Sequence, residues 1–148
     1  MNAVGAFLSA GAMLTLLTAC VSAPQRPSEE GFSLDVVDNA AEQRFDLTLV
    51  SHDAKPLCIQ MEAWPSQSGL MPTQNFAAVL IGQQGEWLSE SDMFSAYCPG
   101  GCGEHRIEPN SQLKGFIAYR AFGDPRQVAE MPEKRLRFSV KPFYCRSR

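Results

Sequence analysis

The chain has 148 residues, of which 45% are hydrophobic and 20% charged, and its formal net charge is -3. This composition is typical of a globular protein and argues against a disordered or low-complexity chain. The small negative charge does not favour nucleic acid as the main partner.

The first twenty residues have the pattern of an export signal. Residues 3–19 are apolar or small and carry no charged side chain. Such a run is slightly short for a membrane-spanning helix, which needs about 20 residues, but it has the length of a signal-peptide apolar region. It ends in Leu17-Thr18-Ala19-Cys20: an aliphatic residue, two small residues and a cysteine. This sequence resembles the lipobox of bacterial lipoproteins.

The resemblance to bacterial lipoproteins implies both a processing route and an address. In that family a diacylglyceryl group is joined to the cysteine sulfur, the signal is cut before the cysteine, and the new amino terminus is usually acylated. The resemblance therefore implies a signal peptide at residues 1–19 and lipid, palmitate included, on Cys20. Val21 stands where an Asp would favour the inner membrane in enterobacterial relatives, so a periplasm-facing outer-membrane location is expected. An ordinary secretory signal and an uncleaved anchor helix are the alternatives.

Two further segments follow the signal. Residues 20–31 hold the lipidated cysteine and lack apolar periodicity, and their prolines and serines are typical of a flexible tether. Residues 32–148 have the length of one domain with its own core. We therefore expect a single exported domain after the tether.

Alternation of apolar and polar residues predicts that this domain consists mainly of β-strands. The expected strands, weaker candidates included, are residues 32–37, 45–49, 57–63, 76–81, 106–108, 116–122 and 135–141. The turn residues between Ser51 and Pro56 are typical of a hairpin loop, and residues 88–96 are the single helix candidate. The pattern predicts an antiparallel β-sandwich, immunoglobulin-like or transthyretin-like, with about seven strands and at most one short helix. A closed barrel is the alternative.

Four cysteines remain in the expected domain, namely Cys58, Cys98, Cys102 and Cys145. An even number of cysteines in an exported chain predicts two disulfides. We favour Cys98 with Cys102 and Cys58 with Cys145, because the first pair closes a small flexible ring and the second ties the terminal strand to an early one. The two other connectivities remain open.

The segment from Cys98 to Cys102 also supports other hypotheses. Its C-P-x-x-C spacing resembles the copper-delivery motif of a thioredoxin-fold family, which implies that Cys98, Cys102 and His105 could bind Cu(I). The surrounding sequence does not have the βαβ pattern of that fold, and a redox-active cysteine pair is a further reading. Some periplasmic lysozyme inhibitors present a similar disulfide loop with a histidine, so inhibition of an envelope hydrolase is another alternative.

The usual catalytic motifs are missing from the sequence. There is no G-x-S-x-G, H-E-x-x-H or phosphate-binding loop, and the S-x-x-K spacing from Ser111 to Lys114 lacks its companion motifs. Trp64 and Trp87 are expected to pack in the core or at its rim, although together on the surface they could stack a sugar. We therefore expect a non-enzymatic envelope lipoprotein that binds or scaffolds a protein partner, without metal, cofactor or nucleic acid.

Overall fold

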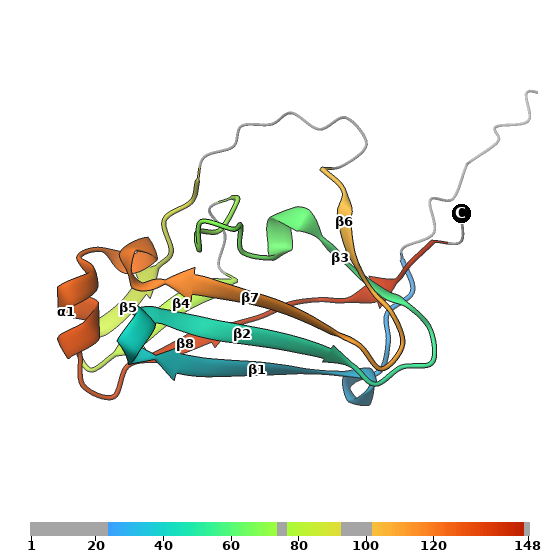
Figure 1. Ribbon diagram of the computed structural model, residues 1–148, viewed down its shortest axis with the longest axis horizontal. Helices are drawn as coiled ribbons and strands as arrows, with labels where there is room; N and C mark the ends of the chain where they lie inside the picture. Colours follow the sequence, from blue (N-terminus) through green and yellow to red (C-terminus); the bar gives the residue numbers. More distant parts are fainter. Residues whose placement is uncertain (1–23, 74–76, 93–101, 147–148) are drawn as a thin grey trace, which may run out of the picture.

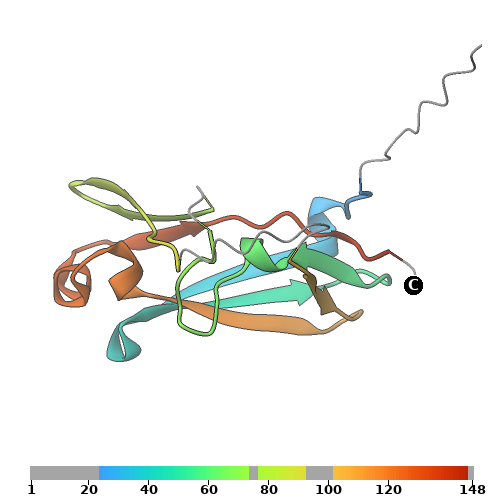
Figure 2. The ribbon, with the colours of Figure 1, turned by 90° about the horizontal axis from the view of Figure 1, so that it is seen from above.

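The computed structural model describes residues 24–73, 77–92 and 102–146. This part of the chain forms three antiparallel sheets of three strands each and one short α-helix (Figure 1). Two of the sheets lie in separate layers, which are seen edge-on in Figure 2. The prediction of an all-β, sandwich-like fold is confirmed, with nine strands in the described residues instead of about seven.

The first sheet contains β1 (Phe32–Asn39), β2 (Arg44–Ser51) and β7 (Gln112–Ala118), in the order β1-β2-β7. Alternate residues of β2 are buried, and Phe45 and Leu47 are each 1% exposed. This period of two places one face of the sheet against the core and leaves the other face partly solvated.

The second sheet contains β6 (Glu104–Ile107), β3 (Leu57–Gln60) and β9 (Phe143–Tyr144), in that order. β2 pairs with β7 and β3 pairs with β6, so the chain forms one antiparallel ribbon that passes from the first sheet into the second. The expected hairpin loop from Ser51 to Pro56 is therefore wrong, because β2 and β3 do not pair with each other.

The third sheet contains β5 (Gly85–Leu88), β4 (Ala78–Gly82) and β8 (Arg135–Phe138), in that order. Leu80 of β4 and Leu136 of β8 are paired, and both belong to the same core cluster as the inner residues of β2. The third sheet thus covers the buried face of the first.

The helices differ from those expected. Leu88 ends β5 and residues 89–92 are not helical, so this half of the predicted helix is wrong; residues 93–96 lie outside the described residues. The α-helix is instead α1 (Pro125–Glu130), which begins where the Asp124 side chain accepts a hydrogen bond from the backbone N–H of Arg126. Proline is tolerated in the first turn, since the N–H that it lacks has no helical partner there.

In the described segments, four short 3-10 helices precede or follow strands. These are η1 (Glu29–Gly31), η2 (Ala40–Glu42), η3 (Met61–Ala63) and η4 (Tyr119–Phe122). The strands expected at residues 57–63 and 116–122 therefore end early, at η3 and η4. The tight turn of η3 leads directly to Trp64, which enters the core.

Trp64 fills the centre of the sandwich. Its side chain is 2% exposed and its indole meets the Phe138 ring edge-on, with 5.8 Å between ring centroids. On the opposite side it lies against Gly115, where an added Cβ would be 2.6 Å from the indole Nε1. Gly115 is paired with buried Leu47, so the glycine makes room in the inner face of β7. One aromatic side chain thus contacts the first and third sheets.

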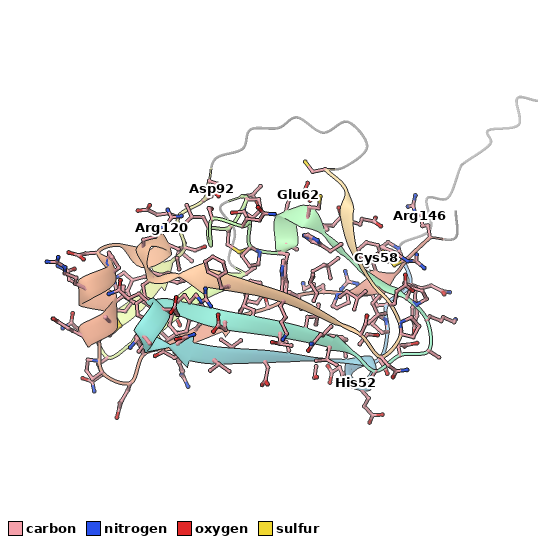
Figure 3. The ribbon with its side chains drawn as sticks, viewed as in Figure 1. His52, Cys58, Glu62, Asp92, Arg120 and Arg146 are labelled. Carbon is pink, nitrogen blue, oxygen red and sulfur yellow. A yellow bond between two sulfur atoms is a disulfide. The ribbon has the colours of Figure 1, made fainter. Side chains whose placement is uncertain are left out.

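A disulfide joins the last strand to an early one. Cys58 of β3 bonds to Cys145, which follows β9, and the two Cα atoms are 5.0 Å apart. The backbone N–H of Cys145 also donates to the carbonyl of Pro56. Figure 3 shows Cys58 at the end of the molecule where the chain terminates. This is the pairing preferred from the sequence.

Part of the expected tether packs on the domain. The N–H of Tyr144 donates to the carbonyl of Gln25 at 2.9 Å, and that of His52 donates to the carbonyl of buried Gly31. Backbone contacts with the domain therefore include residues that precede Phe32, within the segment predicted to be a tether.

Within the described residues, no helix is long and apolar enough to cross a membrane. The apolar run at residues 3–19 lies outside them.

We predict that Gly115→Ala lowers the free energy of unfolding by about 1–3 kcal/mol, because the new methyl group collides with the rigid indole of Trp64. This loss opposes the small gain that alanine normally brings to a strand. Urea unfolding measures the change. Lys114→Ala, at the exposed neighbouring position, is the matched control. A Gly115→Ala protein as stable as this control would contradict the packing of Trp64.

We also predict that the double variant Cys58→Ala/Cys145→Ala is about 4–5 kcal/mol less stable than the wild type. The bond closes a long segment, with a sequence separation of 87, and such cross-links restrict the unfolded chain. Guanidinium unfolding without reductant measures the difference and leaves the remaining cysteines as they are. A loss below about 1 kcal/mol would show that the bond does not constrain the unfolded chain as this account requires.

Candidate functional site

The cysteines singled out in the sequence have separate positions. Cys20 and Cys98 lie outside the described residues, so lipidation and the small-ring disulfide stay predictions. Cys58 and Cys145 form the structural disulfide already described. Cys102 is also disulfide-bonded, and its partner lies outside the described residues.

Cys102 and His105 line a common cavity of about 520 Å³ beside η3. The apolar part of its wall comes from Met61, Trp64 and Pro72. His105 belongs to β6 and is paired with Ile59 of β3, so both side chains lie on one face of the second sheet. The structure therefore brings together two of the three residues proposed for copper, at the edge of the core.

The copper hypothesis also needs Cys98, which lies outside the described residues, and it stays a prediction; Cys102 is not in its metal-binding form. A sulfur already bonded to another sulfur offers no thiolate, which is the ligand form that Cu(I) prefers. Among the described residues, no group of three or more His, Cys, Asp or Glu side chains could hold a metal ion. The hypothesis of a hydrolase inhibitor depends on the loop from Cys98 to Cys102 and stays a prediction.

His105 is half-buried, and this burial lowers the pKa of its imidazole. At pH 7 the ring is therefore neutral and carries one donor and one acceptor nitrogen. Glu62 contributes a further acceptor, because its Oε2 is buried without a hydrogen-bond partner.

A second cavity, of about 440 Å³, lies at the far end of the sandwich between the β4–β5 hairpin and α1. Its volume is within the range of small-molecule sites, roughly 300–1,000 Å³. Apolar wall residues are Trp87, Phe122, Val128 and Met131; polar ones include Gln83, Gln84, Asp124, Gln127 and Glu130. We call this cavity the terminal pocket.

Local sequence chemistry builds the hairpin wall of the terminal pocket. Gly85 has φ 140°, a backbone conformation that residues other than glycine rarely adopt. It therefore allows the tight turn between β4 and β5. An added Cβ at Gly82 would lie 2.4 Å from the Met131 sulfur and 3.3 Å from the Trp87 ring. Glycine at this position therefore lets the methionine and the tryptophan pack closely on the hairpin backbone.

A cluster of three polar side chains, Asp38, Tyr119 and Lys134, supports the helical wall of the terminal pocket. The Tyr119 hydroxyl donates to Asp38 at the end of β1, and the Lys134 ammonium lies 3.2 Å from the same carboxylate. Lys134 also donates to the carbonyl of Ala129 in α1 and lies 5.3 Å from the centre of the Tyr119 ring. Burial, aided by the bond to Asp38, raises the pKa of Tyr119 well above its usual range, so the hydroxyl keeps its proton.

The rim of the terminal pocket offers uncommitted polar groups. Gln84 and Gln127 are exposed, and neither side-chain amide has a hydrogen-bond partner in the part of the chain that the structure describes. Gln84 belongs to the turn of the β4–β5 hairpin and Gln127 to α1, so they come from two different elements of the pocket wall. Each amide carries two donors and an acceptor with two lone pairs. The pocket can therefore form hydrogen bonds around its opening and apolar contacts on its floor.

The sequence did not predict this pocket. Trp87 was correctly expected at the core or its rim, whereas Trp64 and Trp87 do not form a joint platform, since Trp64 is buried. The signal that could have revealed α1 is Asp124-Pro125, a capping residue followed by proline at the first helical position.

Comparisons with protein-family models, with curated proteins and with solved structures gave no match to this chain. Conclusions about function therefore rest on its own residues and geometry.

We predict that folding stability falls as the pH drops below about 6.5, the ordinary pKa of histidine. Burial lowers the pKa of His105 in the folded state, so the unfolded chain takes up the proton first, and this favours unfolding. In His105→Gln the decline in unfolding free energy between pH 7 and 5 should be smaller. The chain has two histidines, so a parallel His52→Gln variant assigns the effect. An unchanged decline in His105→Gln would rule out this explanation.

Proposed function

We propose that this chain is a lipid-anchored, non-enzymatic binding protein of the bacterial cell envelope. The lipobox resemblance at residues 17–20 supports the anchor. The Cys58–Cys145 disulfide supports an exported domain, since such bonds persist in oxidising compartments. The lack of basic character overall supports a partner other than nucleic acid.

The position of the terminal pocket is the observation that carries the binding role. The described chain begins at the end of the molecule where β9 pairs with β3, whereas the pocket lies beside α1 at the opposite end (Figure 1). Gln25, five positions after the proposed lipid site in the sequence, accepts a backbone hydrogen bond from Tyr144 of β9 at this end. In a lipoprotein this arrangement directs the pocket away from the membrane, towards other components of the envelope.

The chemistry of the terminal pocket supports binding more than catalysis. None of its described lining residues is a His, Cys, Ser, Thr or Lys, so its candidate proton-transfer groups are the carboxylates of Asp124 and Glu130. Of its two carboxylates, Asp124 caps α1 by accepting the N–H of Arg126. An apolar floor with a few hydrogen-bonding groups at the rim is typical of a site that recognises a ligand. The domain then binds or scaffolds another envelope component.

We predict that the wild type incorporates labelled palmitate and fractionates with membranes, whereas Cys20→Ser does neither. Two or more acyl chains are needed for stable membrane attachment, and the serine variant has no sulfur on which to build the anchor. Membrane fractionation after carbonate washing measures attachment. Ser22→Ala, beside the proposed lipidated residue, is the matched control and should stay membrane-bound. A Cys20→Ser protein that remains membrane-bound without label would overturn the lipid anchor.

A further inference from the structure

We infer that the terminal pocket binds a neutral saccharide, of which an N-acetylated hexosamine is the best match. This inference rests on the proposed binding role of the pocket and adds its ligand class. A sugar ring has an apolar face made of C–H groups and an edge made of hydroxyls. The terminal pocket has the complementary division, with an aromatic and aliphatic floor and an amide-bearing rim.

Trp87 provides the aromatic surface. It lies on β5 opposite Leu80, half-buried, at the point where the core opens into the pocket. Met131 and the hairpin backbone at Gly82 hold the ring in place. The π-face of an indole carries partial negative charge, and the C–H groups of a sugar carry partial positive charge, so the two surfaces attract. A ring already held by its neighbours loses little entropy on binding.

The amides provide the hydrogen bonds. Hydroxyl groups both donate and accept, and so do the side-chain amides of Gln84 and Gln127. Because these amides are uncommitted and project from two walls, a ring seated on Trp87 would have partners on both sides. The acetamido methyl group of an N-acetylated sugar would meet the apolar floor of the pocket, which Phe122 and Val128 help to line.

The charges of the pocket select against anions. Asp124 and Glu130 line it, and no Lys or Arg is among its described lining residues. Lys134 is near in sequence, but it is bound to Asp38 and to the carbonyl of Ala129. A phosphate or carboxylate ligand would be repelled here, whereas a neutral sugar would not. The alternative that remains is a cation, such as the side-chain ammonium of a peptide, and it can be tested separately.

Binding is tested with chitotriose, the trimer of N-acetylglucosamine, and the lipidated full chain in detergent. The chain has two tryptophans and Trp64 is buried, so a change in fluorescence reports on Trp87. We expect saturable binding in calorimetry with a fluorescence change. Gln84→Ala and Gln127→Ala should each weaken it about tenfold, the effect of losing a hydrogen bond worth about 1.4 kcal/mol. Gln112→Ala, an exposed glutamine of β7 outside the pocket, is the matched control.

Three results would overturn the saccharide inference. The first is no saturation by chitotriose up to about 10 mM with a folded wild type, where even a weak site of about 1 mM would be filled. The second is equal affinity in the Gln84, Gln127 and Gln112 variants. The third is tight binding of Nα-acetyl-lysine amide that is lost in high salt and in Glu130→Gln, which would identify a cation site. Retained chitotriose binding in high salt and in Glu130→Gln supports the neutral ligand.

The same experiments separate this inference from the proposed function. If Cys20→Ser remains on membranes while the pocket binds chitotriose, the lipid anchor fails and the saccharide site stands. If palmitate is incorporated and chitotriose does not bind, the saccharide inference fails and the anchored protein stands.

Discussion

The indole of Trp64 is the contact on which the sandwich depends. It lies between Gly115 in the first sheet and Phe138 in the third, and no larger residue fits at the glycine position without moving the ring. Interiors pack as densely as organic crystals, so the size of this side chain helps to set the separation of the two layers. The 3-10 turn of η3 exists where the chain must leave β3 and deliver the tryptophan to the core.

The bent ribbon of β2–β3 and β7–β6 divides the molecule into two ends with different roles. At one end, the second sheet gathers Gln25, Cys58 and Cys145, and covalent and backbone contacts close the domain there. At the other end, the β4–β5 hairpin of the third sheet and α1 line the terminal pocket. The core therefore becomes accessible beside Trp87, away from both ends of the described chain.

A partly buried polar cluster links the stability of the fold to the shape of the terminal pocket. Asp38 accepts the Tyr119 hydroxyl and pairs with Lys134, and these residues come from β1, η4 and the turn before β8. Removing the Asp38 carboxylate would leave the buried Tyr119 hydroxyl and the largely buried Lys134 ammonium without their partner, and Lys134 is the member that contacts α1. The uncommitted glutamines at the rim are thus presented on a rigid frame, which is what ligand recognition requires.

Local patterns in the sequence determined the all-β class and most of the strands, because period-two alternation shows which face of a strand meets the core. The Cys58–Cys145 pairing was the favoured one of three connectivities, and the tertiary structure decided it. Local patterns did not predict α1, since six residues are too few to show a helical period, nor that β2 and β3 lie in different sheets. Only the tertiary structure decided the terminal pocket. Its walls come from the β4–β5 hairpin and from α1, which are distant in the chain. The sequence around Trp64 and Trp87 also gave the same expectation for both, namely packing in the core or at its rim. Packing alone buries the first against Gly115 and leaves the second at the opening.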